Sequence, residues 1–186
     1  GLYNALAVIY GDRILAVYHK QRLPSYEVFD EHRYFQPGNA ACVVDIAGSR
    51  MAFTVCEDMW EAEPVAQAKA AGAQLMININ ASPYHLNKLH DRRSLLQRRS
   101  GEGGFPIVYV NMVGGQDELV FDGGSMAVAA SGECRRLAPA YEEGLYPLSL
   151  DIAADGSCSL PMQDMASPQE LEEQVYQALV LGVRDY

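Results

Sequence analysis

The pattern of apolar and polar positions predicts that strands dominate the first 55 residues. Two strand pairs are predicted, residues 2–10 with 13–18 and residues 42–46 with 51–55. In the first pair, Gly11-Asp12 separates two apolar runs, which is typical of a β-hairpin. Residues 21–40 lie between the pairs and mix prolines, charges and aromatics. We therefore expect a long loop there, of the kind that is usually functional.

The middle of the chain alternates between helix and strand. Pro64 fits the first turn of a helix that ends at Gly72, and residues 74–79 then read as a buried strand. Cys56 lies where the preceding strand ends, so the order is strand, cysteine, helix, strand. A basic helix at 86–99, a strand at 106–113 and a strand meander at 118–137 follow. This order predicts an α/β (α+β) fold.

The last part of the chain reads as a linker followed by a helix. Residues 153–167 carry Gly, Ser, Asp and Pro without periodicity, which indicates a linker. Ser167, Pro168 and Glu170 form a helix-start signal, so a helix is predicted over 168–186. Its apolar stripe consists of Leu171, Val175, Ala178, Leu179 and Val183. Such a stripe needs a packing partner, either in this domain or outside it.

Composition and charge narrow the possible partners. Of the 186 residues, 49% are apolar or aromatic, enough to bury a sizeable core. The formal charge of −10 argues against nucleic acid and anionic membranes as partners. The longest apolar runs fall far short of the roughly 20 residues that span a bilayer. We therefore expect a globular cytoplasmic protein with no nucleic-acid partner and no membrane partner.

The cysteines do not form a recognisable scaffold. They are Cys42, Cys56, Cys134 and Cys158. Four scattered cysteines without CxxC spacing predict reduced thiols and no metal site. Cys56 has two interpretations, a nucleophile at a strand-to-helix turn or a small buried hydrophobic residue. Because Glu57 and Asp58 raise the pKa of a neighbouring thiol, a nucleophile here needs a cation to offset them.

Basic residues concentrate in one predicted helix. They are Lys88, Arg92, Arg93, Arg98 and Arg99. This cluster is either a nucleic-acid patch or a solvated helix face. The acidic balance of the chain and the lack of interleaved aromatics favour the solvated face.

Two stretches resemble motifs of the nitrilase (carbon-nitrogen hydrolase) superfamily. They are KQRLP at 20–24 with FDE at 29–31, and TVCED at 54–58. Two further stretches, 114–125 and 176–186, resemble the glutaminase domain of the glutamine-dependent NAD synthetase family and the helix that begins its synthetase domain. Resemblance to this family therefore covers nearly the whole chain.

The resemblance implies a fold and a domain order. The fold is the α-β-β-α four-layer sandwich, here lacking its N-terminal part. Residues 1–152 would form the glutaminase domain, 153–167 the linker, and 168–186 the first helix leading into an ATP-dependent synthetase domain absent from the chain. The family also implies assembly into a homo-oligomer.

The resemblance also implies a catalytic apparatus. Cys56 would attack the side-chain amide of glutamine, and the Lys20 ammonium would stabilise the oxyanion. We expect the two residues to lie close together at the ends of neighbouring strands. Glu31 matches a glutamate that supports the lysine, although a solvated loop carboxylate is its alternative interpretation. The superfamily's general-base glutamate precedes the lysine, and residues 1–19 contain no Glu, so this chain alone is expected to be inactive.

Five further residues match positions that contact glutamine in these enzymes. They are Tyr26, Glu57, Trp60, Ser82 and Lys88. The Glu57 carboxylate suits the α-ammonium of the substrate, and Lys88 or Ser82 suits its α-carboxylate. Tyr26 and Trp60 have an alternative interpretation as core aromatics.

The implied reaction releases ammonia, which a synthetase domain would use to amidate deamido-NAD with ATP and Mg. No cofactor is expected within this chain itself. Two other functions remain open from the sequence. One is a stand-alone amidase or carbamoylase of the same superfamily, and the other is a non-catalytic nitrilase-like dimerisation module.

Overall fold

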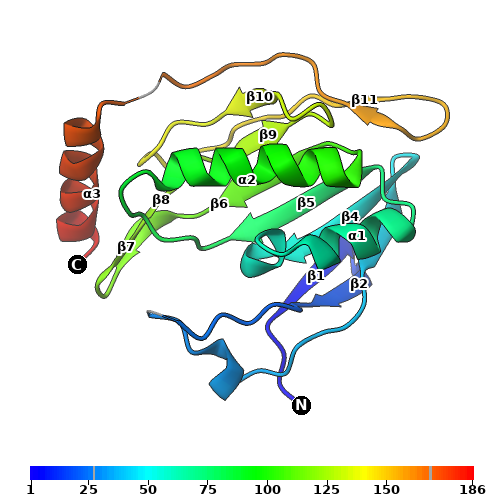
Figure 1. Ribbon diagram of the computed structural model, residues 1–186, viewed down its shortest axis with the longest axis horizontal. Coiled ribbons are helices and arrows are strands. Elements are labelled where there is room, and N and C mark those ends of the chain that lie inside the picture. Colours follow the sequence, from blue (N-terminus) through cyan, green and yellow to red (C-terminus); the bar gives the residue numbers. More distant parts are fainter. Residues whose placement is uncertain (27, 168) are drawn as a thin grey trace.

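A computed structural model describes residues 1–26, 28–167 and 169–186. A six-stranded mixed sheet with the order β10-β9-β6-β5-β4-β3 forms the centre of the molecule (Figure 1). Its strands are β3 (Cys42–Ile46), β4 (Ser49–Val55), β5 (Leu75–Asn80), β6 (Ile107–Asn111), β9 (Met126–Val128) and β10 (Cys134–Leu137). Neighbours β4, β5 and β6 are parallel, and the other pairs are antiparallel. The carboxyl ends of β4, β5 and β6 therefore meet at one edge, where α/β sheets commonly place their ligands.

Two helices cover one face of this sheet. They are α1 (Ala62–Ala70) and α2 (Lys88–Gly103), which cross the sheet in front of β4, β5 and β6 (Figure 1). Val65 of α1 and Leu96 of α2 pack with Met76 and Ile107 from the sheet. The predicted helix after Cys56 and the strand that follows it are confirmed. The chain leaves α1 through Gly72, whose φ of +77° suits a residue without a Cβ.

The opposite face of the sheet is covered at β3 and β4 by the predicted N-terminal hairpin. Its strands are β1 (Ala5–Tyr10) and β2 (Arg13–His19), and they pair antiparallel. Side chains of this hairpin, such as Leu6 and Tyr18, share a hydrophobic cluster with Met51 and Phe53 of β4. The hairpin forms a separate two-stranded sheet. The molecule therefore has a helix layer, a central sheet and a small second sheet.

Two predicted segments differ from the structure. The meander at 118–137 is divided, because β8 (Leu119–Asp122) pairs with β7 (Val113–Gln116) in a separate hairpin, whereas β9 and β10 join the central sheet. The predicted linker contains β12 (Cys158–Ser159), which pairs with β11 (Asp151–Ile152). Two short 3₁₀ turns, η1 (Glu31–Arg33) and η2 (Cys56–Met59), were also not predicted.

The last helix, α3 (Leu171–Asp185), starts later than predicted. Its N-terminal cap is Glu170 rather than Ser167, and Pro168 lies outside the described residues. The helix packs on β7 and β8 through its buried residues Ala178 and Leu181. A Cβ added at Gly115 of β7 would lie 3.1 Å from the Cα of Gly182, so a small residue permits this close approach.

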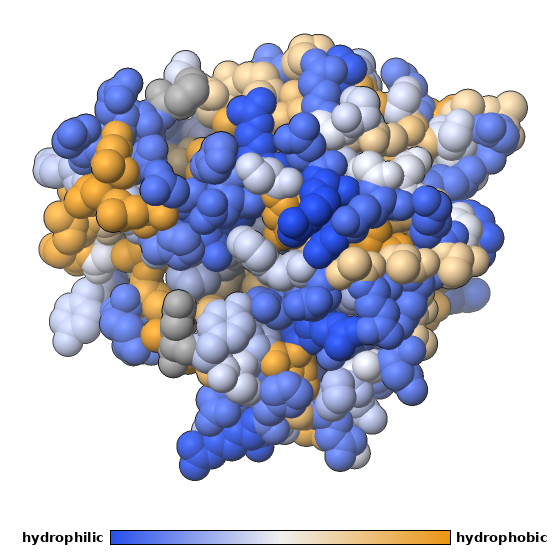
Figure 2. All heavy atoms as spheres, viewed as in Figure 1, coloured by the Kyte–Doolittle hydropathy of each residue, from blue (hydrophilic) through white to orange (hydrophobic). Residues whose placement is uncertain are grey.

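The apolar stripe of α3 does not face the domain. Of its five members only Ala178 is buried; Leu179 is 65% and Val183 80% exposed. Figure 2 shows hydrophobic side chains gathered at this end of the molecule. Of the two partners considered for the stripe, this domain therefore covers only Ala178. No helix in the described part of the chain has the length and apolar character needed to cross a bilayer.

Candidate functional site

Cys56 occupies a strained position at the end of β4. It is the first residue of η2, and its φ is +47°, a left-handed conformation that few residues other than glycine adopt. Such backbone conformations cluster at active sites, because the surrounding structure must hold them. The Cys56 side chain lines a cavity of about 440 Å³. The geometry therefore favours the nucleophile over the interpretation as a buried hydrophobic residue.

The structure brings every site residue predicted from the sequence to this one cavity. Its lining includes Lys20, Tyr26, Glu31, Cys56, Glu57, Trp60, Ser82 and Lys88. They come from the end of β2, the following long loop, η2, the loop after β5 and the start of α2. A larger cavity of about 590 Å³, lined mainly by α2, the segment after β10 and the start of α3, contains none of them.

Lys20 lines the cavity as a buried and paired ammonium. Its side chain is 1% exposed, and Nζ lies 2.6 Å from Oε1 of Glu31. The other carboxylate oxygen of Glu31 accepts a hydrogen bond from Nδ2 of Asn4 at 3.3 Å. Glu31 is therefore an ion-pair partner, and its interpretation as a solvated loop carboxylate is wrong.

Lys20 and Cys56 do not lie at the ends of neighbouring strands, as the sequence predicts, but on two different sheets. Lys20 follows β2 of the small hairpin sheet, whereas Cys56 follows β4 of the central sheet. The two strands are not hydrogen-bonded neighbours. The cavity lies where the two sheets pack together, so each sheet contributes one of the two groups.

The thiol of Cys56 is surrounded by opposing charges. Burial raises the pKa of the Cys56 thiol above its ordinary value. Of the charges around it, the Lys20 ammonium has the largest effect and lowers this pKa. Three carboxylates raise the pKa: Glu57, Glu31 and Asp58. Lys20 is therefore the cation that the sequence required, but it does not outweigh burial.

A carboxylate and an ammonium face the same cavity. Glu57 accepts a hydrogen bond from the Tyr26 hydroxyl at 2.9 Å, and burial raises the pKa of Glu57. Nζ of Lys88 lies 4.3 Å from the centre of the Trp60 ring, a cation–π distance. Burial and the nearby Arg92 guanidinium lower the pKa of Lys88. This pair of opposite charges suits a zwitterionic ligand such as an amino acid.

The two aromatic residues of the site behave differently. Tyr26 is 50% exposed, so its interpretation as a core aromatic is wrong. Trp60 is half-buried and packs against the main hydrophobic cluster while it also lines the cavity. Trp60 therefore combines the two interpretations.

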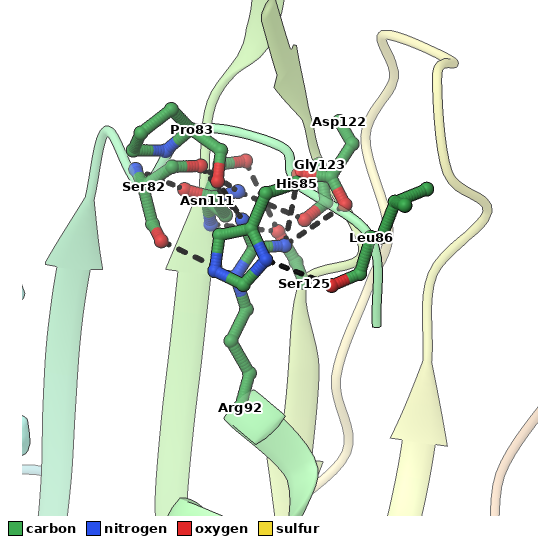
Figure 3. Close-up of polar contacts among 9 residues, drawn as sticks. All are labelled: Ser82, Pro83, His85, Leu86, Arg92, Asn111, Asp122, Gly123 and Ser125. Carbon is green, nitrogen blue, oxygen red and sulfur yellow. Dashed lines mark hydrogen bonds and ion pairs between the residues drawn. The ribbon is translucent and has the colours of Figure 1, made fainter. Parts of the chain in front are cut away.

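A buried arginine fixes the wall that carries Ser82. Arg92 is 0% exposed, and its Nη2 donates to the carbonyls of Ser82 at 2.7 Å and Pro83 at 3.2 Å. Nη1 of Arg92 donates to the Asp122 carboxylate at 2.9 Å. Asn111 completes the network by accepting the Ser82 N–H at 2.9 Å (Figure 3). The loop after β5 is thus held in place by Arg92 and Asn111.

A second arginine of α2 fixes the wall that carries Cys56. Nε of Arg99 donates to the carbonyl of Met59 at 2.9 Å, and Nη2 donates to that of Trp60 at 2.6 Å. The interpretation of the basic helix as a solvated face is therefore wrong for Arg92 and Arg99. It holds for the exposed Arg93 and Arg98. The clustering of basic residues in the sequence could not show which arginines are buried and which are exposed.

The sequence did not point to three further polar residues that line the cavity, Asn4, Asn80 and His85. Nδ2 of Asn80 donates to Oδ1 of Asn78 at 2.8 Å, so two amides share one face of β5. Two asparagines spaced by one residue in a buried strand were the available signal for a polar wall. In the described ranges, no group of three or more His, Cys, Asp or Glu side chains is placed to hold a metal ion.

Comparison with known proteins gives a consistent result. Residues 1–155 match the carbon-nitrogen hydrolase family. The glutamine-dependent NAD(+) synthetase of Aquifex aeolicus is 38% identical over 215 residues, covering 100% of this chain and 38% of that protein. The protein of the same name from Xanthomonas campestris is 40% identical over 188 residues, covering 100% of this chain and 34% of its own length. The chain therefore spans about a third of the length of these relatives.

Solved structures agree with the sequence matches. Glutamine-dependent NAD+ synthetase from Acinetobacter baumannii in complex with ADP superposes with a TM-score of 0.91 and 36% identity, over 99% of this chain and 34% of that one. An amidase of the nitrilase superfamily from Nesterenkonia AN1 superposes with a TM-score of 0.63 and 32% identity, over 70% of this chain and 48% of that one. With its mixed sheet, its cysteine at the strand end and a match over most of its length, the chain belongs to the carbon-nitrogen hydrolase family.

Proposed function

We propose that this chain is the glutaminase portion of a glutamine-dependent NAD synthetase, and that it binds glutamine and supplies the nucleophile that attacks the side-chain amide. One observation carries the proposal: a single cavity holds the Cys56 thiol, the buried Lys20 ammonium and the opposite charges of Glu57 and Lys88. An amide carbonyl requires a nucleophile and an oxyanion donor, and a free amino acid requires partners for its ammonium and carboxylate. The similarity to NAD synthetases supports the same substrate.

In the proposed reaction, Sγ of Cys56 attacks the amide carbon of glutamine. The negative charge that develops on the amide oxygen is stabilised by the Lys20 ammonium, and one such donor contributes about 3 kcal/mol. The C–N bond then breaks, ammonia leaves with the proton that the thiol gave up, and a glutamyl thioester remains on Cys56. Water hydrolyses this thioester to glutamate and regenerates the thiol.

Two groups in the cavity would recognise the amino-acid end of glutamine. Glu57 would accept hydrogen bonds from the α-ammonium, while Lys88 or the Ser82 hydroxyl would bind the α-carboxylate. With these groups at the amino-acid end of glutamine, Lys20, which lines the same cavity and is paired with Glu31, would face the side-chain amide. This arrangement gives the substrate one orientation.

The wider proposal concerns the rest of the protein. The chain would form part of the α-β-β-α sandwich as residues 1–152, followed by a linker at 153–167 and by helix α3, which would lead into a synthetase domain. That domain would use ATP, Mg and the released ammonia to amidate deamido-NAD, in a cytoplasmic homo-oligomer. The ADP complex of the Acinetobacter relative supports nucleotide use by the larger protein.

Covalent labelling tests the substrate of this chain. A chloromethyl ketone analogue of glutamine, whose electrophilic carbon replaces the amide nitrogen, should alkylate Cys56, as detected by peptide mass spectrometry. L-glutamine should protect against labelling, and L-glutamate should protect much less. Cys56→Ala should abolish the adduct, and the other partly exposed cysteine, Cys158, serves as the internal control. Equal labelling of Cys56 and Cys158, without protection by glutamine, would contradict the proposal.

A small-amide hydrolase is the second candidate, because an amidase from Nesterenkonia is among the structural relatives. One structure of that enzyme is described with covalent addition of the acetamide moiety of fluoroacetamide at its active-site cysteine. Chloroacetone carries the same electrophile as the glutamine analogue but lacks the amino and carboxylate groups. If chloroacetone labels Cys56 as fast as the glutamine analogue does, the amidase is favoured.

The wider proposal has its own test in a protein that joins this chain to a synthetase domain. Cys56→Ala should abolish NAD formation from glutamine but leave formation from free ammonium intact, because only the ammonia source is removed. Loss of both activities would mean that Cys56 has a structural role.

A further inference from the structure

Asp58 is a buried carboxylate that accepts four hydrogen bonds. It is 0% exposed. Oδ1 accepts the backbone N–H groups of Gln21 at 3.0 Å and Arg22 at 2.8 Å. Oδ2 accepts the backbone N–H of Val55 at 3.0 Å and the hydroxyl of Tyr18 at 2.8 Å. Each oxygen therefore has two donors, and the carboxylate is fully occupied within the protein.

These donors come from the two segments that carry the site. Gln21 and Arg22 directly follow Lys20, and Val55 directly precedes Cys56. The strands that lead to Lys20 and Cys56 belong to different sheets, so no ladder of strand hydrogen bonds sets their separation. Asp58 connects the two segments, because its carboxylate accepts backbone hydrogen bonds from both of them.

Asp58 is poorly placed to activate the thiol. Its negative charge raises the pKa of Cys56, and burial raises its own pKa, which the four donors oppose. A buried carboxylate costs several kcal/mol unless it is well hydrogen-bonded. What this residue supplies is therefore geometry rather than charge.

We propose that Asp58 is a positioning residue that holds the Lys20 segment against the Cys56 turn, so that the ammonium and the thiol face one substrate carbonyl. The inference rests on the proposed function for what those two groups do. The test of this inference needs no catalytic turnover. The reactivity of the Cys56 thiol depends on how close the Lys20 ammonium lies.

The test is the rate of Cys56 alkylation by iodoacetamide as a function of pH, followed by peptide mass spectrometry, in Asp58→Asn. The variant removes a charge that raises the thiol pKa, so a purely electrostatic role predicts faster alkylation at neutral pH. A positioning role predicts the opposite, because Lys20 influences this thiol more than Asp58 does and its contribution is lost when it moves. We expect alkylation at pH 7 to slow roughly three- to tenfold.

The Lys20→Met background separates the two effects. With no ammonium left to misplace, Asp58→Asn should now speed the alkylation of Cys56 rather than slow it. Asp45→Asn is the matched control, because Asp45 is an exposed carboxylate on β3 and should leave the rate unchanged. The buried thiols of Cys42 and Cys134 should stay protected in every variant, which checks that the fold is intact.

The outcomes distinguish this inference from the proposed function. If Lys20→Met alone leaves the pH profile of Cys56 unchanged, the pairing on which the proposed function depends is wrong. If Lys20→Met slows alkylation but Asp58→Asn speeds it, only the role of Asp58 is wrong. Should Asp58→Asn expose Cys42 and Cys134, Tyr18→Phe replaces it. That change removes one neutral donor and keeps the carboxylate, so slower alkylation supports positioning and an unchanged rate overturns it.

Discussion

The thiol of Cys56 is kept protonated in the free protein. Burial and three carboxylates outweigh the Lys20 ammonium, so the pKa of the thiol lies above its ordinary value. Because the thiolate is the nucleophile, its fraction at neutral pH is small and rises as the pH increases. A substrate that brings its own ammonium next to Glu57 would offset one of the carboxylates. Recognition of the amino-acid end and activation of the thiol are thereby linked.

Glu57 provides the residue-scale prediction. Glu57→Gln should raise about tenfold or more the glutamine concentration that protects Cys56 from the chloromethyl ketone, because a hydrogen bond to a charged group contributes about 1.5–3 kcal/mol. In the unchanged protein, protection needs the ionised carboxylate and is present above its pKa. Burial raises that pKa, so protection should be lost as the pH falls through a midpoint above about 4.3.

The control for this measurement is Glu61→Gln. Glu61 is exposed and does not line the cavity, so protection by glutamine should be unchanged. Equal weakening in both variants would mean that the overall negative charge, rather than the position of Glu57, attracts the ligand.

At the residue scale, most of the site was predictable because short motifs carry it. The family resemblance identified eight of the residues that line the cavity, whereas spacing alone left Cys56 between two interpretations. The sequence could not assign Asp58, because three of its four partners, Tyr18, Gln21 and Arg22, lie 36 to 40 residues earlier in the chain. Hydrogen bonds between distant segments have no local signature.

Among the elements, α2 connects the central sheet to the site through buried arginines. Arg92→Met should lower the free energy of unfolding by about 3–5 kcal/mol, because it leaves the Asp122 carboxylate buried without its cation. Urea denaturation measures this as a lower midpoint with an unchanged m value. Arg93→Met, on an exposed position of the same helix, should change stability by no more than about 0.5 kcal/mol. Similar losses in the two variants would show that helix propensity, not the buried ion pair, decides stability.

The elements themselves were predicted well where local signals are strong. The N-terminal hairpin, the pair β3–β4 and the unit β4–α1–β5 follow from turn residues and periodicity. The orientation of α3 was not predictable, because this helix is apolar on more than one side and packing on β7 and β8 selects Leu181 over Leu179. The helix starts later than its sequence signal predicts, because Glu170 rather than Ser167 is the N-terminal cap.

For the whole molecule, the cavity lies where two separate sheets meet, and this determines what the chain can do alone. The described carboxylates that line the cavity are both engaged, Glu31 with Lys20 and Glu57 with Tyr26. Neither is free to take the thiol proton and pass it to ammonia. General-base catalysis contributes about 10²- to 10⁴-fold in rate.

We therefore expect the purified 186-residue chain to show no steady release of glutamate from glutamine. A coupled glutamate dehydrogenase assay measures this release, with Cys56→Ser as the background. Intact folding is verified in the same sample by single alkylation at Cys56. Turnover that disappears in Cys56→Ser would contradict the expectation and make Glu31 and Glu57 the candidates for the base.

The spacing of Arg92 and Arg99 along α2 sets the distance between two anchor points in the walls of the cavity. The two residues are seven positions apart, so they lie nearly in line on the helix and about 10.5 Å apart along its axis. Arg92 anchors the wall with Ser82, and Arg99 anchors the wall that ends at Trp60. Helix α2 thus fixes the spacing between these two walls. One residue inserted between them would add about 1.5 Å to this spacing and rotate one arginine by about 100° around the helix axis, so the two walls could no longer both be anchored by the same helix face.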